Sequence, residues 1–205
     1  MSRRSPPIDA CRYRAGIRRA NMAGLVICAA MALVWVGPFG PGMLAEAGDS
    51  PESPQIVKAQ DLVKMIPFVV WPPAALGDPG AAFTLCVVGD DPFGPLLDQT
   101  VAGQVVDGRA MTVRRMSRLA AGVSCQIVYA AGSGEQPVAD ILRQLHGQPV
   151  LTVTDRAADG TQGVVDFVIS DGQVRFDIDD QAAAENNLTI SSKLLGLALA
   201  VRARK

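Results

Sequence analysis

The sequence predicts an α/β fold, a three-layer single domain with a mostly parallel sheet and a C-terminal antiparallel hairpin. Short apolar runs alternate with segments of helical periodicity between residues 55 and 154, which is the pattern of successive βαβ units. Two further runs, 164–169 and 173–178, flank Asp171-Gly172, and an Asp-Gly pair between alternating runs predicts a tight hairpin. Together these observations predict one sheet within one domain.

The predicted elements follow one another along this domain. A helix over 55–70 has apolar residues at helical spacing, and Pro67 ends or kinks it. The run 83–89 is a buried strand, and Asp91 then caps a short helix that ends near Gly103. The remaining predictions are strands at 111–116, 125–130 and 149–154, a helix over 133–145 capped by Ser133 and stopped by Gly147, and two C-terminal helices over 179–187 and 192–203 around a break at 188–190.

The N-terminal 47 residues have the pattern of a secretory signal peptide. Six arginines accompany an uncharged apolar run of 15 residues, Met22–Val36, and Ala45-Glu46-Ala47 supplies a small-x-small cleavage pattern. The sequence therefore predicts a signal peptide at 1–47, a flexible tether at 48–55 and a periplasmic domain at 56–205. The alternative is an uncleaved N-terminal anchor, although the apolar run is shorter than the ~20 residues that span a bilayer.

Cleavage after Ala47 changes the charge and the cysteine content of the chain. The predicted mature chain has 13 basic and 18 acidic side chains, so its net charge is about −5 and no basic stripe remains. Nucleic acid is therefore not an expected partner. Cys11 and Cys28 belong to the leader, which leaves Cys86 and Cys125 in an oxidising compartment where a disulfide persists.

Several short motifs occur in a defined order along residues 56–203. They are Lys58-Ala59 followed by Phe68-Val69-Val70-Trp71-Pro72, then Leu85–Gly94, Cys125–Tyr129, Gly147–Val153, Phe167–Ile178 and Ile190–Leu195. Their order and spacing resemble the YfiR family of periplasmic regulators. The resemblance implies a homodimer with no enzymatic activity and no cofactor. It also implies binding to the periplasmic domain of an inner-membrane diguanylate cyclase of the GGDEF type. The bound cyclase is held inactive until redox state or envelope stress relieves the inhibition.

Cys86 and Cys125 lie on strands that are expected to be neighbours. In a doubly wound sheet of order 2-1-3-4, Cys86 is on the first strand and Cys125 begins the third. A strand spacing of ~4.8 Å suits the ~4.4–6.8 Å that separates the Cα atoms of a disulfide. The sequence favours a bridge, either a structural staple or a redox switch, and two buried free thiols are the alternative. Some members of the resembled family have a second cysteine pair, which Asp159–Phe167 lacks, so any redox response depends on one pair.

The sequence predicts neither a catalytic site nor a metal site. His146 is the only histidine and lies near a predicted helix C-terminus, where a cationic side chain suits the helix dipole. No serine has a nucleophile-elbow setting, and one histidine with two bridged cysteines leaves no metal-ligand cluster. An envelope enzyme is therefore the function that the sequence supports least.

Polar side chains at the carboxyl ends of the predicted strands form a candidate ligand pocket, because open α/β sheets bind ligands there. The candidate residues are Asp90, Asp91, Tyr129 and Asp155, with Ser133 and Thr154 at analogous strand ends. The alternative for the two adjacent aspartates is a helix cap and a turn. A ligand pocket here would suit a second hypothesis, a periplasmic module that senses a small molecule for a transporter or a kinase.

The C-terminal hairpin carries a candidate partner surface, whose residues are Phe167, Arg175 and Asp177. Arg175 and Asp177 alternate with apolar residues, so one face of their strand is solvated and the other packs. The family resemblance favours this region as the partner contact, and an ordinary solvated face is the alternative. Trp71 is either a partner anchor or, before two prolines, an aromatic side chain packed at a helix end.

Overall fold

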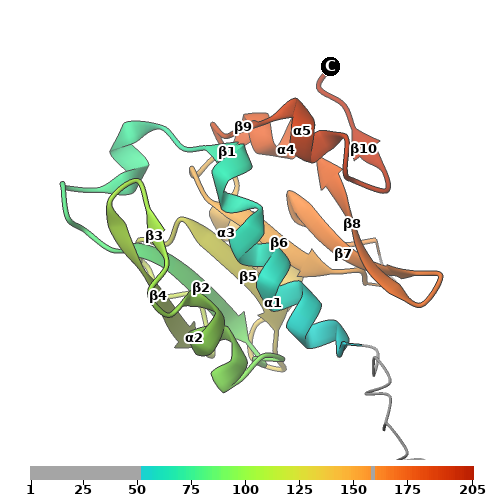
Figure 1. The fold of residues 1–205 in the computed structure, drawn as a ribbon, viewed down its shortest axis with the longest axis horizontal. Coiled ribbons are helices and arrows are strands. Elements are labelled where there is room, and N and C mark those ends of the chain that lie inside the picture. The colour runs from blue at the N-terminus through green and yellow to red at the C-terminus, as the bar shows by residue number, and fades with distance from the viewer. Residues whose placement is uncertain (1–51, 158–159) are drawn as a thin grey trace, which may run out of the picture. The chain divides into compact units, whose positions relative to one another are not determined.

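An eight-stranded, mostly parallel sheet organises the fold in the computed structural model, which describes residues 52–157 and 160–205 (Figure 1). The predicted signal peptide at 1–47, with Cys11 and Cys28, lies outside the described residues. The helices are α1 (Pro54–Lys64), α2 (Pro95–Val101), α3 (Val138–Leu145), α4 (Asp180–Glu185) and α5 (Ser192–Leu195), with the 3-10 turns η1 (Ile66–Phe68) and η2 (Pro73–Leu76). The strands are β1 (Val69–Val70), β2 (Phe83–Gly89), β3 (Val105–Val106), β4 (Arg109–Met116), β5 (Ile127–Gly132), β6 (Leu151–Asp155), β7 (Val165–Ser170), β8 (Gln173–Asp179), β9 (Thr189–Ile190) and β10 (Val201–Arg202).

The strand order of the large sheet is β10-β8-β7-β6-β5-β2-β4-β3. The central strands β4, β2, β5, β6 and β7 are parallel, and β2 lies between β4 and β5, so the predicted order 2-1-3-4 is confirmed. Strands β7 and β8 form the predicted antiparallel hairpin. Its turn residues, Asp171 and Gly172, both have positive φ (53° and 74°), as a type I′ turn requires.

Helices cover both faces of the sheet, so the predicted three layers are confirmed. Successive side chains of β2 point to opposite faces. Phe83 and Leu85 join the core beneath α1 and α2, whereas Cys86 and Val88 join a smaller core beneath α3. In Figure 1, α1 crosses in front of the sheet and α3 lies behind it. Burial on both faces explains why β2 is a continuous apolar run rather than an alternating one.

The first helix ends as predicted and leads into a short second sheet. Ser53 caps α1 by accepting a hydrogen bond from the backbone N–H of Ile56 (3.4 Å), and Pro67 lies in η1 beyond the end of α1. Strand β1 then pairs antiparallel with β9, with Val69 opposite Ile190. The predicted break at 188–190 is therefore partly a strand.

Two predicted helix starts are wrong. Asp91 does not cap α2: its Oδ1 accepts a hydrogen bond from the N–H of Phe93 (2.8 Å) within a turn, and α2 follows Gly94. Ser133 does not cap α3 either, because α3 begins after Pro137. The Ser133 hydroxyl instead accepts hydrogen bonds from the next backbone N–H groups in a preceding turn.

The predicted C-terminal helix over 192–203 is also wrong. Helix α5 ends at Leu195, and Gly196 follows it as the C-cap. Turns and bends over 196–199 then bring the chain to the sheet: the N–H of Leu199 donates to the carbonyl of Phe176 (2.8 Å), and β10 pairs parallel with β8. The apolar run at the C-terminus therefore forms the edge of the sheet instead of a helix face.

Candidate functional site

A disulfide joins Cys86 and Cys125, as the sequence favours. Cys86 lies in β2 and Cys125 lies just before β5, and their Cα atoms are 6.0 Å apart. Cys86 is fully buried against α3, whereas Cys125 is 6% exposed. A cavity of about 290 Å³ is lined by Cys125, Ser124 and Gln148. Of the two cysteines, Cys125 is thus the one that lines this cavity.

Tyr129 and Asp155, two residues of the candidate ligand pocket, lie together, but only Asp155 ends its strand: Tyr129 lies within β5, which continues to Gly132. Tyr129 is buried, with its ring edge-on to Phe93 at 4.7 Å between centroids. Burial raises the pKa of Tyr129 most, and the charge of Asp155 and a hydrogen bond to it raise the pKa further. Lys58 of α1 reaches the same carboxylate (Nζ to Oδ1, 2.7 Å). The cluster therefore links α1 to the central strands β5 and β6.

The other two pocket candidates, Asp91 and Asp90, are used differently. Asp91 accepts a hydrogen bond from Arg115 of β4 (Nε to Oδ2, 2.6 Å), and Arg115 also binds Asp98 of α2 (2.7 Å). This contact with Arg115 lowers the pKa of Asp98. Asp90 has an exposed side chain, and its backbone N–H donates to the carbonyl of Gly132 (2.8 Å).

The strand-end carboxylates thus have partners inside the protein. Asp155 has Lys58 and Tyr129, and Asp91 has Arg115. The cavity beside Cys125 is lined by other residues. This geometry favours a structural role for the cluster, which links α1 and the loop after β2 to the sheet.

Phe167 lies on the opposite face of the β7–β8 hairpin from Arg175 and Asp177. The register pairs Phe167 with Phe176, and it pairs Asp177 with Asp166 on the other face. Phe167 is buried beneath α1, with the Lys58 ammonium 6.0 Å from the centre of its ring. The three candidate partner residues are therefore not brought together on one exposed surface.

The polar face of the hairpin is organised by Arg156. Its guanidinium binds Asp166 (Nε to Oδ2, 3.1 Å) and Asp177, and Asp166 also accepts a hydrogen bond from Thr154 (2.7 Å). These hydrogen bonds raise the pKa of Arg156. Arg175 is exposed and makes no ion pair within the described residues. Of the predicted pair, Arg175 is thus the one available to a partner.

Four exposed apolar residues border the other face of the hairpin, and we call them the C-terminal apolar surface. They are Ile169, Leu197, Leu199 and Val201, with exposed fractions from 41% to 59%. Ile169 lies near the hairpin turn, Leu199 is hydrogen-bonded beside Phe176, and Val201 lies opposite Ile178 in the register of β10 with β8. In Figure 1 the hairpin and β10 lie at the same edge of the sheet.

Ion pairs hold the last residues of the chain in place next to this surface. Arg202 binds Asp179 (3.0 Å), and Arg204 binds Asp180 through two hydrogen bonds (2.8 and 3.0 Å). Both carboxylates are nearly buried, whereas the arginines are partly exposed. Sequence reasoning missed this surface because it read the same run as a helix.

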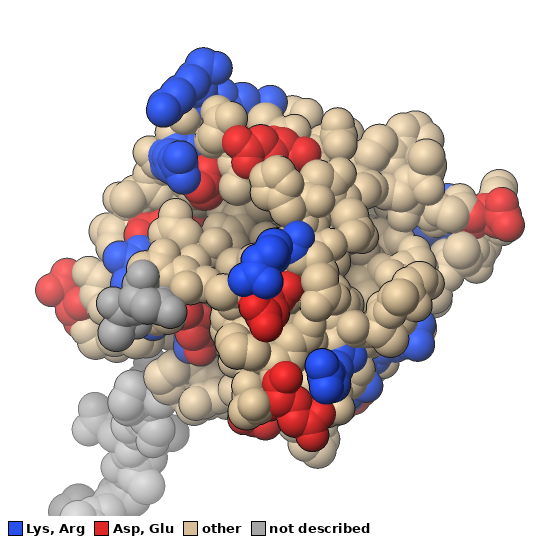
Figure 2. All heavy atoms as spheres, turned by 180° about the vertical axis from the view of Figure 1, so that it is seen from behind, with Lys and Arg blue, Asp and Glu red and all other residues tan. Residues whose placement is uncertain are grey.

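Charged side chains on the back of the domain do not form an extended basic patch. Figure 2 shows Lys and Arg there in small, separate groups, most of them beside Asp or Glu. No helix among residues 52–157 and 160–205 is long and apolar enough to cross a membrane. In the same part of the chain, His, Cys, Asp and Glu side chains form no group of three or more that could hold a metal ion.

Comparison with models of protein families gives a match. The model of a protein family described as YfiR/HmsC-like matches residues 55–199, which is more than half of the chain and nearly all of the described fold. A search of curated proteins finds no match.

Proposed function

Because the chain belongs to the YfiR/HmsC-like family, which implies a regulator of the YfiR type, we propose that it binds and inhibits an inner-membrane diguanylate cyclase. The partner domain is the periplasmic part of a cyclase of the GGDEF type, and this protein reaches it in the periplasm. The observation that carries the proposal is the family match over the whole domain. The proposed role needs binding and no catalysis.

The C-terminal apolar surface is the contact that we propose for this partner. Specific interfaces have a desolvated apolar centre with a polar rim. Ile169, Leu199 and Val201 supply exposed apolar side chains for its centre. Arg175 lies on the opposite face of the hairpin, so it lies outside this contact. Asp177 positions Arg156 within the protein, so its contribution to the interface is indirect.

Inhibition follows from a shift in the partner's conformational equilibrium. A regulator that binds the inactive conformation of the cyclase more tightly than the active one raises the population of the inactive state. Release of the regulator restores the active population, and cyclic di-GMP then rises. A homodimer would present two copies of the surface, which suits a dimeric membrane enzyme.

The disulfide offers a redox input to the same regulation. A thiolate that enters the cavity beside Cys125 attacks its Sγ, and Cys86 leaves as a thiolate, which gives a mixed disulfide. A second thiol of the reductant displaces Cys125 and completes the reduction. The segment before β5 is then no longer linked to β2, and we propose that the loosened domain releases its partner.

The experiment is a pull-down from membranes with the tagged protein from the periplasm. Wild type should retain a GGDEF-type cyclase, and Ile169→Asp should lose it because a charge would be buried at the centre of the interface. Val105→Asp is the matched control, because Val105 is similarly exposed (63% against 59%) at the opposite edge of the sheet. Equal retention by wild type and Ile169→Asp would reject the surface, and retention of no cyclase would reject the function.

A further inference from the structure

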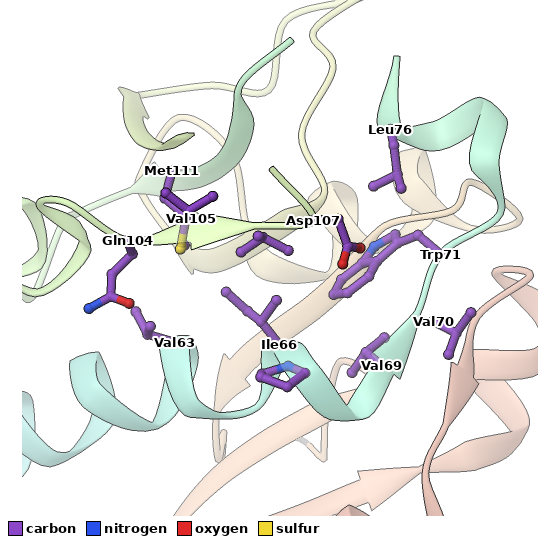
Figure 3. Close-up of a pocket in the computed structure, with 12 residues that line it drawn as sticks. Val63, Ile66, Val69, Val70, Trp71, Leu76, Gln104, Val105, Asp107 and Met111 are labelled. Carbon is purple, nitrogen blue, oxygen red and sulfur yellow. The ribbon is translucent and has the colours of Figure 1, made fainter. Parts of the chain in front are cut away.

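An apolar cavity lies between the segment from α1 to η2 and the β3–β4 hairpin (Figure 3). Its volume is about 410 Å³, within the range of small-molecule sites. Buried Ile66, Trp71 and Met111 line it, and exposed Val70 and Val105 border its mouth. The cavity lies near β3, and the C-terminal apolar surface lies at the opposite edge of the sheet.

The cavity lining has one charged residue, Asp107. Asp107 and Gly108 form the two-residue turn between β3 and β4, with φ of 49° and 77°. Asp107 and Trp71 both line the cavity, and both are labelled in Figure 3. No basic residue lines the cavity, and Asp107 has no ion-pair partner in the described part of the chain. Asp107 is exposed, so water solvates its charge and the carboxylate is available to a cation at this apolar site.

The indole of Trp71 is fixed in its orientation by its neighbours. Its Nε1 donates a hydrogen bond to the carbonyl of Gln126 (3.1 Å), and its ring is edge-on to Phe83 with centroids 5.2 Å apart. A fixed aromatic ring and a carboxylate that line the same cavity suit an ammonium group, because both groups attract a cation. Little side-chain freedom would be lost when a ligand binds.

We propose that this cavity binds a small organic cation, an ammonium group on an aryl or alkyl body. The ammonium lies between Asp107 and the Trp71 ring, and the apolar body fills the space lined by Ile66 and Met111. An anion is disfavoured by Asp107, and a neutral apolar molecule leaves that carboxylate without a partner. The site is separate from the proposed cyclase contact, so the proposal holds whether or not a cyclase is the partner.

The test uses phenethylammonium as the probe and Trp71 emission as the reporter. The protein carries Trp35→Phe, which leaves Trp71 as the only tryptophan of the chain. We expect saturable binding by calorimetry, with a matching change in Trp71 fluorescence. 2-Phenylethanol, which has nearly the same shape but no charge, should bind about tenfold more weakly. Phenylacetate should not bind.

Two turn variants make the test specific for Asp107. Asp107→Asn keeps a residue that tolerates positive φ, and it should lower the affinity for phenethylammonium about tenfold while leaving that for 2-phenylethanol unchanged. Asp171→Asn is the matched control, because Asp171 begins the same type of turn in the β7–β8 hairpin and does not line the cavity. It should leave both affinities unchanged.

Several outcomes would overturn the proposal. Equal affinities for the amine and the alcohol would remove the role of charge, and unchanged amine binding in Asp107→Asn would remove the role of Asp107. Binding heat without a change in Trp71 emission would place the ligand elsewhere. A lack of binding at millimolar concentrations would reject the site. This outcome includes the case in which a second copy of the protein or a peptide covers the cavity.

Discussion

Tyr129 illustrates how a buried polar residue within a strand is stabilised. Its hydroxyl group would be costly to bury alone, and the hydrogen bond with Asp155 offsets that cost. Asp155 in turn is neutralised by Lys58, which lies 97 residues earlier in the chain. No local pattern indicates a contact of that separation, and for this reason the sequence predicted the strand-end positions but not their partners.

This environment predicts a specific pH dependence of stability. The pKa of Tyr129 is raised in the folded protein, mainly by burial and then by the charge of Asp155, above the value of ~10 expected when unfolded. Between these two pKa values the folded state binds more protons, so the free energy of unfolding falls as pH rises above ~10. Tyr129→Phe should remove this loss, at a cost of about 1 kcal/mol near neutral pH from the missing hydrogen bond.

Urea unfolding of both proteins between neutral pH and ~11 measures the effect. The difference in stability between wild type and Tyr129→Phe should shrink above pH ~10, because only wild type loses stability through this group. The two proteins differ only at residue 129, so the comparison isolates the contribution of Tyr129. Two curves that stay parallel across this range would contradict the argument.

At the scale of elements, two glycines, Gly89 and Gly132, lie in close contact where β2 meets β5. Gly89 has a φ of 100°, and a Cβ there would lie 2.1 Å from the carbonyl oxygen of Gly132. Gly94 also has a positive φ (52°), but a Cβ there would have nothing within 4 Å. The two positions separate the cost of a strained backbone from the cost of a steric clash.

Alanine substitutions should therefore differ in their effect on stability. Gly94→Ala should cost about 1–3 kcal/mol for the backbone conformation alone. The cost of Gly89→Ala should exceed the cost of Gly94→Ala by at least ~1 kcal/mol, because the backbones of two strands must move apart. Chemical denaturation of both variants provides the measurement. Equal losses would show that the junction tolerates the added methyl group.

The disulfide is a second link between elements, and its removal should be costly. It joins residues that are 39 apart in sequence, and closing a loop of that length constrains the unfolded chain by about 3–4 kcal/mol. Cys86→Ser combined with Cys125→Ser should lower the free energy of unfolding by roughly this amount. The reduced wild type should fall to a similar value. Unchanged stability in both would show that the bridge is not a staple.

Local signals explain which elements were predicted from the sequence. The β7–β8 hairpin has a specific turn pair, Asp171-Gly172, and β2 is an apolar run closed by Gly89, so both were predicted. The bridge was predicted because it follows from the order of the sheet. The strand in the C-terminal segment was not predicted, because an apolar run after α5 is compatible with either a helix or a strand until its neighbour β8 is known. The starts of α2 and α3 were set by Pro95 and Pro137, not by the nearby Asp91 and Ser133.

At the scale of the whole molecule, the two edges of the sheet have different features. The C-terminal apolar surface lies along β8 and β10, whereas the cavity at Trp71 lies near β3. A partner could therefore dock at one edge while the other stays open. Strands β2, β5 and β6 between them are buried on both faces, and the bridge at Cys86 reinforces this central part.

The central claim is that this protein holds a diguanylate cyclase inactive, and the cellular level of cyclic di-GMP tests it most directly. A clean deletion should raise that level, and expression of the wild type from a plasmid should return it to normal. Expression of Ile169→Asp at the same periplasmic abundance should fail to do so, whereas Val105→Asp should succeed. An unchanged level of cyclic di-GMP in the deletion strain would contradict the account.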